Sequence, residues 1–212
     1  MTSLSRRAFV TASAAALLTG CGGGDGTAPA SNSAAKQGSS EQGSPTPATP
    51  SAAAKPVHAL ARSVPVTLRV PAIGVDTPVM KLGLAADGTV QVPPITAHDR
   101  AGWYRYSPTP GRTGPSVILG HVTVGAYGDG VFRHLARLRT GNRIDVVLEN
   151  GTTAVFAVTE VRTVAKADFP SDEVYGNVDR PELRLITCGG TRTGTGYLDN
   201  VIVFAALTAA SP

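Results

Sequence analysis

From about residue 63 onward, apolar and polar residues alternate in short runs, which is the pattern of half-buried β-strands. Asn150 and Gly151 separate two of these runs and predict a tight hairpin. Residues 131–138, VFRHLARL, have the strongest helical pattern and predict about two turns of helix. The expected strands are 66–70, 79–84, 89–92, 116–119, 144–149, 152–164, 182–187 and 200–207. Short strands separated by turns indicate one all-β domain, either a barrel or a sandwich.

The N-terminus has a different pattern, that of an export signal. Residues 5–10 read SRRAFV, and the paired arginines run into an apolar segment, residues 8–18. This segment is shorter than the roughly 20 apolar residues that span a bilayer, and twin arginines favour the bacterial Tat route. It ends in LTGC, which resembles a bacterial lipobox. We predict that residues 1–21 are a Tat-type lipoprotein signal with Cys21 acylated; an ordinary cleaved signal and a short uncleaved anchor are the alternatives.

Residues 22–62 consist almost entirely of Gly, Ser, Ala, Thr, Pro, Gln and Lys. Such a segment cannot bury enough apolar surface to offset the entropy of ordering, so it predicts a disordered tether. About 40 flexible residues have a root-mean-square reach of roughly 35 Å. With a lipid at Cys21, this tether would hold a domain of residues 63–212 near the extracellular face of the bacterial cell membrane.

The charge of the chain does not indicate a nucleic-acid partner. The sequence has 19 basic and 15 acidic residues, a formal net charge of +4. Removing the signal takes away Arg6 and Arg7, which leaves a net charge of only +2. Proteins that bind nucleic acid usually concentrate more positive charge on one domain, so no nucleic-acid partner is expected.

Cys188 ends the apolar run RLIT and stands directly before two glycines. The chain has one other cysteine, Cys21, and a lipid there would remove the possible disulfide partner. A free cysteine outside the cell is then buried, paired with another chain, or reactive. Free cysteines are often simply buried as small apolar side chains. One cysteine with scattered histidines lacks the spacing of zinc ligands, and neither a metal nor a cofactor is expected.

A cysteine nucleophile needs a base or a cation nearby, because the thiolate is the reactive form. His121 stands at a predicted strand end, in VILGHV, as Cys188 does, and the two strand ends would meet at one rim of a barrel. The alternative is a core histidine with satisfied hydrogen bonds. The other histidines lie in the tether, in a loop and in the helical pattern: His58, His98 and His134.

Attack on a carbonyl also needs a donor for the oxyanion. Arg192 follows Cys188 by four residues, just before the last strand, and a short turn would bring its guanidinium over the thiol. The alternative is a solvated loop arginine. Arg184 starts farther away, because four residues of an extended strand span roughly 13 Å.

These motifs resemble the sortase family, and within it the actinobacterial group called class F. The resemblance covers nearly the whole domain in collinear blocks, which are LRVPAIGVDTPVMKLGLAADGTVQVPP, AGWYRYSPTPGRTGPSVILGHV, VFRHLARLRTGNRIDV, LRLITCGG and GYLDNVIVFAAL. It implies a closed eight-stranded β-barrel with one or two short helices. On the matching positions it implies that Cys188 is the nucleophile, His121 the acid and base, Arg192 the oxyanion donor and Thr187 a substrate-binding residue.

The resemblance also implies an activity, that of a thiol transpeptidase. Sortases attack the Thr-Gly bond of an LPxTG-like sorting signal in an exported protein and form a thioester. An amine of the cell-wall precursor, or water, then resolves it. The segment between Cys188 and Arg192 is shorter than usual in the family, which favours a tethered binding module with little catalysis as the alternative. A different cell-wall cysteine transpeptidase is a third possibility, although its Ser-His-Gly-Cys signature is absent.

Overall fold

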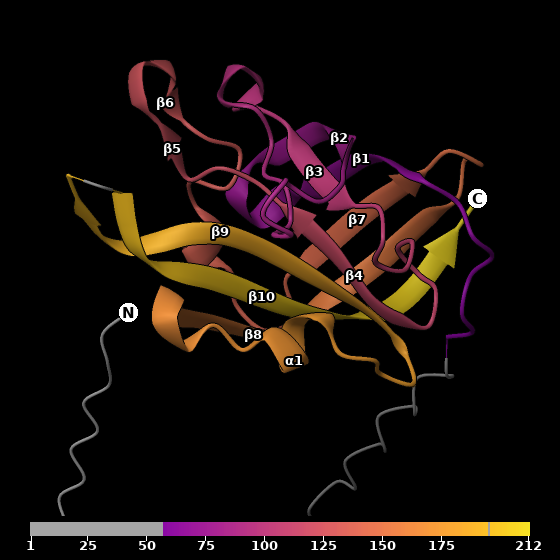
Figure 1. Ribbon diagram of the computed structural model, residues 1–212. Helices are drawn as coiled ribbons and strands as arrows, with labels where there is room; N and C mark the ends of the chain where they lie inside the picture. The colour runs from indigo at the N-terminus through magenta and orange to yellow at the C-terminus, as the bar shows by residue number, and fades with distance from the viewer. Residues whose placement is uncertain (1–56, 195) are drawn as a thin grey trace, which may run out of the picture. The chain divides into compact units, whose positions relative to one another are not determined.

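Eight strands close a barrel in the computed structural model, which describes residues 57–194 and 196–212 (Figure 1). Around the barrel the strands follow the order β1-β2-β3-β4-β9-β10-β8-β7. Their bounds are β1 Pro65–Val70, β2 Val75–Leu82, β3 Ala101–Tyr104, β4 Gly114–Leu119, β7 Arg143–Leu148, β8 Thr153–Ala165, β9 Pro181–Thr193 and β10 Gly196–Ser211. The predicted signal with Cys21, and the predicted tether up to residue 56, lie outside the described residues.

Two strand pairs of the barrel are parallel, β2 with β3 and β4 with β9, and the other six are antiparallel. In the second parallel pair, the register runs from Gly114 opposite Pro181 to Leu119 opposite Ile186. Parallel pairing places the carboxyl ends of β4 and β9 at the same end of the barrel.

The barrel is filled by side chains from all eight strands. Trp103, Ile118 and Phe156 are among the largest side chains that are almost completely buried. Side chains alternate between the two faces of a strand, so β9 directs Leu183 and Leu185 inward and places their neighbours outside. The interior is therefore packed.

A second apolar cluster lies on the outer face of the barrel. It includes Leu119 of β4, Ile186 of β9, Ile202 of β10, and Val174 of the helix α1, Ser171–Tyr175. Because α1 covers these strands, β4 and β9 are buried on both faces there. This explains why SVIL and RLIT read as continuous apolar runs rather than as alternating ones.

The strand predicted at residues 89–92 does not form, apart from a single bridge between Leu84 and Val90. Its place in the barrel is taken by β3, which pairs in parallel with β2. Gly102 of β3 leaves no space for a side chain, since a Cβ there would lie 2.4 Å from a methyl group of Leu82. The pattern AGWY shows no alternation, because most of β3 is buried on both faces.

The helix predicted at residues 131–138 is also wrong, except for one 3-10 turn, η4, Leu135–Arg137. Phe132, Leu135 and Leu138 are fully buried in the barrel core, so their spacing reflects packing rather than a regular helix. The helix α1 agrees with the one or two short helices that the family resemblance implied, but its position was not predicted, and neither was the two-stranded hairpin of β5, Thr123–Val124, and β6, Gly128–Asp129. The remaining 3-10 turns are η1 Pro71–Ile73, η2 Ile95–Ala97, η3 Gly125–Tyr127 and η5 Lys166–Asp168.

The segment before β1 packs against the barrel at the end where β1 begins. The Leu60 amide donates to the Gly111 carbonyl at 2.8 Å, and the Glu149 amide donates to the Val64 carbonyl at 2.8 Å. Gly111 has φ +91°, and a Cβ there would lie 2.4 Å from the Leu60 side chain. Among residues 57–194 and 196–212, no helix is long and apolar enough to cross a membrane.

Candidate active site

Cys188 lies on the outer face of the barrel, two residues beyond the last β9 residue that pairs with β4, and it is half-buried. The strand expected to end at Thr187 in fact continues to Thr193, so Cys188 lies within β9. The glycines that follow it allow β9 and β10 to run close together. A Cβ on Gly189 would lie 2.6 Å from Val201, and one on Gly190, which has φ +71°, would overlap the carboxylate of Asp199. The sequence Cys-Gly-Gly therefore fits a stretch of β9 at which a side chain after the cysteine would push β10 away.

The parallel register of β4 and β9 brings the backbone at His121 close to the backbone at Cys188. Leu119 is opposite Ile186, and each strand reaches its candidate residue two positions later. The Gly120 amide donates to the Ile186 carbonyl at 3.1 Å, which continues the pairing beyond β4. Neighbouring strands are about 4.8 Å apart, so the structure brings His121 and Cys188 to adjacent positions at one end of the barrel.

The imidazole of His121 is held by the backbone of the loop before β3. Its Nε2 donates a hydrogen bond to the Pro93 carbonyl at 2.6 Å. A carbonyl oxygen only accepts hydrogen bonds, so Nε2 has the proton in this arrangement and Nδ1 is the nitrogen left for proton exchange.

Two hairpins project from the same end of the barrel as Cys188, the hairpin of β5 and β6 and the tip of β9 and β10 (Figure 1). They are joined by a hydrogen bond of 2.9 Å between the hydroxyl groups of Thr123 and Tyr197. The site is therefore bordered by two short hairpins that are fixed to each other.

A pocket of about 250 Å³ opens beside Cys188. Thr187 and Val201 line it from the inner face of the strands, and Phe132, Thr163 and Tyr197 are also part of its wall. Thr187 is only 4% exposed, and its Oγ1 has no hydrogen-bond partner among the described residues. A buried hydroxyl without a partner is unfavourable, so Thr187 is a candidate to contact a ligand in this pocket.

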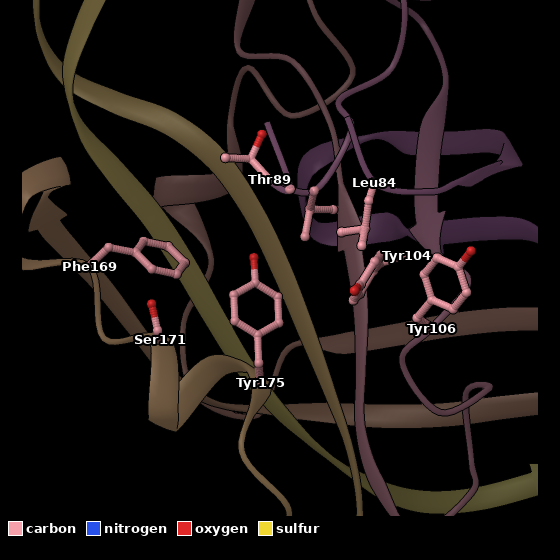
Figure 2. Close-up of a pocket in the computed structure, with 9 residues that line it drawn as sticks. Leu84, Thr89, Tyr104, Tyr106, Phe169, Ser171 and Tyr175 are labelled. Atoms are coloured by element: carbon pink, nitrogen blue, oxygen red, sulfur yellow. The ribbon is translucent and has the colours of Figure 1, made fainter. Parts of the chain in front are cut away.

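A larger pocket of about 570 Å³ lies on the outer face of the barrel, between β3 and α1. Figure 2 shows Tyr175 rising from α1 between Phe169 and Tyr104. The rings of Tyr104 and Tyr175 meet edge to face, with centroids 6.2 Å apart. Burial raises the pKa of Tyr175, and the nearby Tyr104 adds to this shift. The sequence analysis missed this pocket, although the aromatic run GWYRY is its visible signal.

This outer pocket is on the same face of β9 as Cys188. Tyr104 and Phe169 pack against the outer apolar cluster, which contains Ile186. Ile186 precedes Cys188 by two residues, so both side chains leave β9 on the same side. An extended peptide lying along this face would have its apolar part in the pocket and a later peptide bond near the thiol.

The structure places Arg192 at the tip of the hairpin, opposite Tyr197 and exposed. It is four residues beyond Cys188 in the same strand, roughly 13 Å away along the backbone. Within the described part of the chain, its guanidinium makes no hydrogen bond or ion pair. The residue opposite Cys188 on β10 is Asn200, which the sequence analysis did not single out.

A sequence model of the sortase domain matches residues 68–208. The chain belongs to the sortase family. Solved sortase structures also share the fold. The SrtA sortase from Actinomyces oris is 26% identical with a TM-score of 0.53, and the match covers 76% of this chain and 89% of that one. No curated protein matches the chain.

Two more distant sortases give the same result for the fold. Sortase A of Listeria monocytogenes is 19% identical with a TM-score of 0.52, over 70% of this chain and 90% of that one. The Sortase D5 transpeptidase of Clostridium perfringens is 23% identical with a TM-score of 0.51, over 69% and 79%. The closed eight-stranded barrel is thus the sortase fold, and family membership supports a cysteine transpeptidase.

Proposed function

We propose that this sortase cleaves an LPxTG-like sorting signal between Thr and Gly and transfers the acyl group to a cell-wall amine or to water. The observation that supports this most directly is the register of β4 and β9, which brings the backbone at His121, two residues after β4, close to the backbone at Cys188, within β9. A thiol and an imidazole carried on neighbouring backbone positions of a rigid barrel are the two groups that an activated cysteine needs.

In the first half of the reaction, the Cys188 thiolate attacks the threonine carbonyl carbon, and the carbonyl π electrons move to the oxygen. When the tetrahedral intermediate collapses, the C–N bond breaks and His121, protonated on Nδ1, gives its proton to the departing glycine amine. The hydrogen bond from Nε2 to the Pro93 carbonyl keeps the ring oriented during this transfer. The product is a thioester on Cys188.

In the second half, an amine or a water molecule attacks the thioester and His121 accepts its proton. The Cys188 thiolate leaves, and an amide or a free carboxylate forms. We place the incoming nucleophile in the pocket of about 250 Å³ beside Cys188, where Thr187 offers a buried hydroxyl without a partner among the described residues.

The outer pocket is suited to the apolar start of the sorting signal. Its aromatic side chains, Tyr104, Tyr175 and Phe169, form flat walls that suit leucine and proline. Because the pocket shares a face with Ile186 and Cys188, an extended peptide would run from it toward the thiol. The occupants we propose are proteins with an LPxTG-like signal near their C-terminus.

We also propose a class F sortase anchored by lipid on the extracellular face of the bacterial membrane. Support comes from the collinear sequence blocks and from LTGC ending at Cys21, which lies outside the described residues. Metabolic labelling with radioactive palmitate tests the anchor. We expect label in the full chain and none in Cys21→Ser, with Cys188→Ser as the matched control that stays labelled.

The activity is tested with residues 57–212 and a fluorogenic LPxTG peptide, with and without triglycine. We expect slow cleavage, a triglycine adduct detected by mass spectrometry, and complete loss of both in Cys188→Ala. Intact peptide after long incubation, together with a native thiol that resists alkylation, would leave the binding module as the better proposal. The exposed position of Arg192, away from Cys188, is the observation that favours that alternative.

A further inference from the structure

The neighbour of Cys188 on its other side is Asn200 of β10. Residues directly opposite each other in an antiparallel pair share a face, with Cβ atoms about 5 Å apart. The preceding pair on this face, Ile186 with Ile202, belongs to the outer apolar cluster. The side chains of Cys188 and Asn200 therefore leave their strands on the outer face of the barrel. Cys188 therefore lies between His121, which follows β4 by two residues, and Asn200 on β10.

Asn200 is an unusual residue for its position. It directly precedes the apolar run Val201, Ile202 and Val203 in the middle of a long strand, where asparagine is disfavoured relative to β-branched residues. Its side chain is half-buried and makes no hydrogen bond to any described residue. Strand propensity and local hydrogen bonding therefore do not account for an asparagine here.

The chemistry of a carboxamide suits this place. Its two N–H groups are neutral donors with no acceptor among the described residues, and the side chain is short enough to be held in place by the strand. An oxyanion donor must lie about 3 Å from the oxygen that gains charge, next to the attacked carbon. Asn200 leaves the backbone opposite the thiol, whereas Arg192 leaves it roughly 13 Å along β9.

We infer that Asn200 donates a hydrogen bond from Nδ2 to the oxyanion formed when Cys188 attacks a carbonyl. This inference rests on the proposed function. The sulfur–carbon bond forms on one side of the carbonyl carbon, and the carbonyl oxygen turns toward Asn200 as it becomes negative. No proton moves from the amide. His121, on the opposite side of Cys188, supplies the proton of the leaving amine, so the two neighbours of the thiol have separate tasks.

The test compares acylation of Cys188, which passes through an oxyanion, with alkylation, which does not. The variants are Asn200→Ala and, as matched control, Arg192→Ala, and the alkylating reagent is iodoacetamide. With the LPxTG peptide, we expect Asn200→Ala to lower the acylation rate by about 10² to 10³, and alkylation to change by less than about threefold. Asn200→Gln should restore part of the rate, because it keeps the amide donors.

The opposite pattern would overturn the inference. If Arg192→Ala lowers the acylation rate by about 10² and Asn200→Ala keeps a near-native rate, the oxyanion donor is Arg192. Equal losses in acylation and alkylation for Asn200→Ala would mean that Asn200 only holds the thiol in place. If Asn200→Ala does not fold, Asn200→Val replaces it, since valine favours strands and has no donor.

A second acyl donor separates this inference from the proposed function. p-Nitrophenyl acetate acylates a thiol through an oxyanion but has no sorting signal. We expect Asn200→Ala to slow release of p-nitrophenol by about tenfold, less than with the peptide because the leaving group is better. Ester acylation that depends on Asn200, with no peptide cleavage by the native protein, would reject the proposed substrate alone. Ester acylation unaffected by Asn200→Ala would reject the oxyanion role.

Discussion

Arg184 on β9 donates hydrogen bonds from Nε and Nη2 to the backbone carbonyl of Glu173 in α1, at 3.4 and 3.3 Å. The same guanidinium forms an ion pair of 2.5 Å with Glu182, and both side chains are more than nine-tenths buried. Glu173 is in the last turn of α1, where carbonyl groups lack helical partners and attract cations. Arg184 thus fastens the helix that carries Tyr175, one wall of the outer pocket, to the strand that carries the thiol.

Replacing Arg184 by methionine should destabilise the domain and loosen α1. Removing one member of a buried ion pair costs about 3–5 kcal/mol, and we expect a loss of this size in urea unfolding. Arg180→Met is the control, because the side chain of Arg180 also pairs with Glu182 but is 68% exposed and has no ion pair with α1 among the described residues. Arg180→Met should lower the free energy of unfolding by less than about 1 kcal/mol.

Hydrogen exchange separates the helix from the ion pair in this comparison. We expect faster exchange of the α1 amides in Arg184→Met and in Glu182→Gln/Arg184→Met, in which the carboxylate that has lost Arg184 is also removed. Native protection of α1 in both variants would show that apolar packing of Val174 alone holds the helix.

His121→Gln should remove the acid and base while keeping the local structure. The glutamine amide can still donate to the Pro93 carbonyl, but it does not exchange protons near neutral pH. We expect kcat/KM for the LPxTG peptide to fall by about 10² to 10⁴. His134→Gln is the control and should retain the native rate. Near-native turnover of His121→Gln would assign the proton transfer to another group.

Thr187→Val should raise stability and lower activity. Valine has nearly the same shape as threonine and removes a buried hydroxyl that has no partner among the described residues, so unfolding should require about 1 kcal/mol more free energy. If Thr187 contacts the incoming nucleophile, triglycine transfer falls while thioester formation stays native, as single-turnover mass spectrometry would show. Ser116→Ala serves as the control, because Ser116 is also buried without a partner among the described residues. Unchanged transfer in Thr187→Val would remove Thr187 from the site.

Tyr175 should make the domain less stable in strong alkali. Burial raises its pKa above the ordinary value of 10.0, so the folded state holds its phenol proton more tightly than the unfolded state does. This contribution to stability is complete below pH 10 and is lost as the pH rises through the folded-state pKa. Tyr175→Phe should lose less unfolding free energy above pH 10 than the native protein. Identical alkaline profiles would mean that the phenol is solvated.

The nearness of the backbone at Cys188 and at His121 could be anticipated from sequence, because two apolar runs mark the segments of β4 and β9 that pair. The apolar runs SVIL and RLIT stop at Gly-His and Thr-Cys, and the shared sortase blocks support both positions. Such local patterns do not predict which distant strands pair with each other. The position of Asn200 opposite Cys188 can be recognised only when the register of β9 and β10 is known. The alternation of apolar and polar residues does not give this register, because shifting a strand by two residues leaves the same side chains on each face.

The two wrong elements have a related cause. Residues 131–138 have helical spacing, but their apolar side chains fill one end of the barrel and the backbone follows the cavity. Residues 89–92 alternate as a strand should, yet β3 takes the barrel position because it is apolar on both faces and reaches β2 in parallel. In both segments tertiary packing determined the secondary structure, and tertiary packing cannot be predicted from a short local sequence.

The contact between Leu60 and Gly111 determines where mechanical load enters the domain. A pull on the chain before residue 57 acts first on this contact and on the hydrogen bond between Glu149 and Val64, at the barrel end where β1 begins. His121, Cys188 and Asn200 lie at the other end of the barrel, beyond the paired length of β4 and β9. A force applied to the chain before residue 57 would therefore act on the barrel end opposite Cys188.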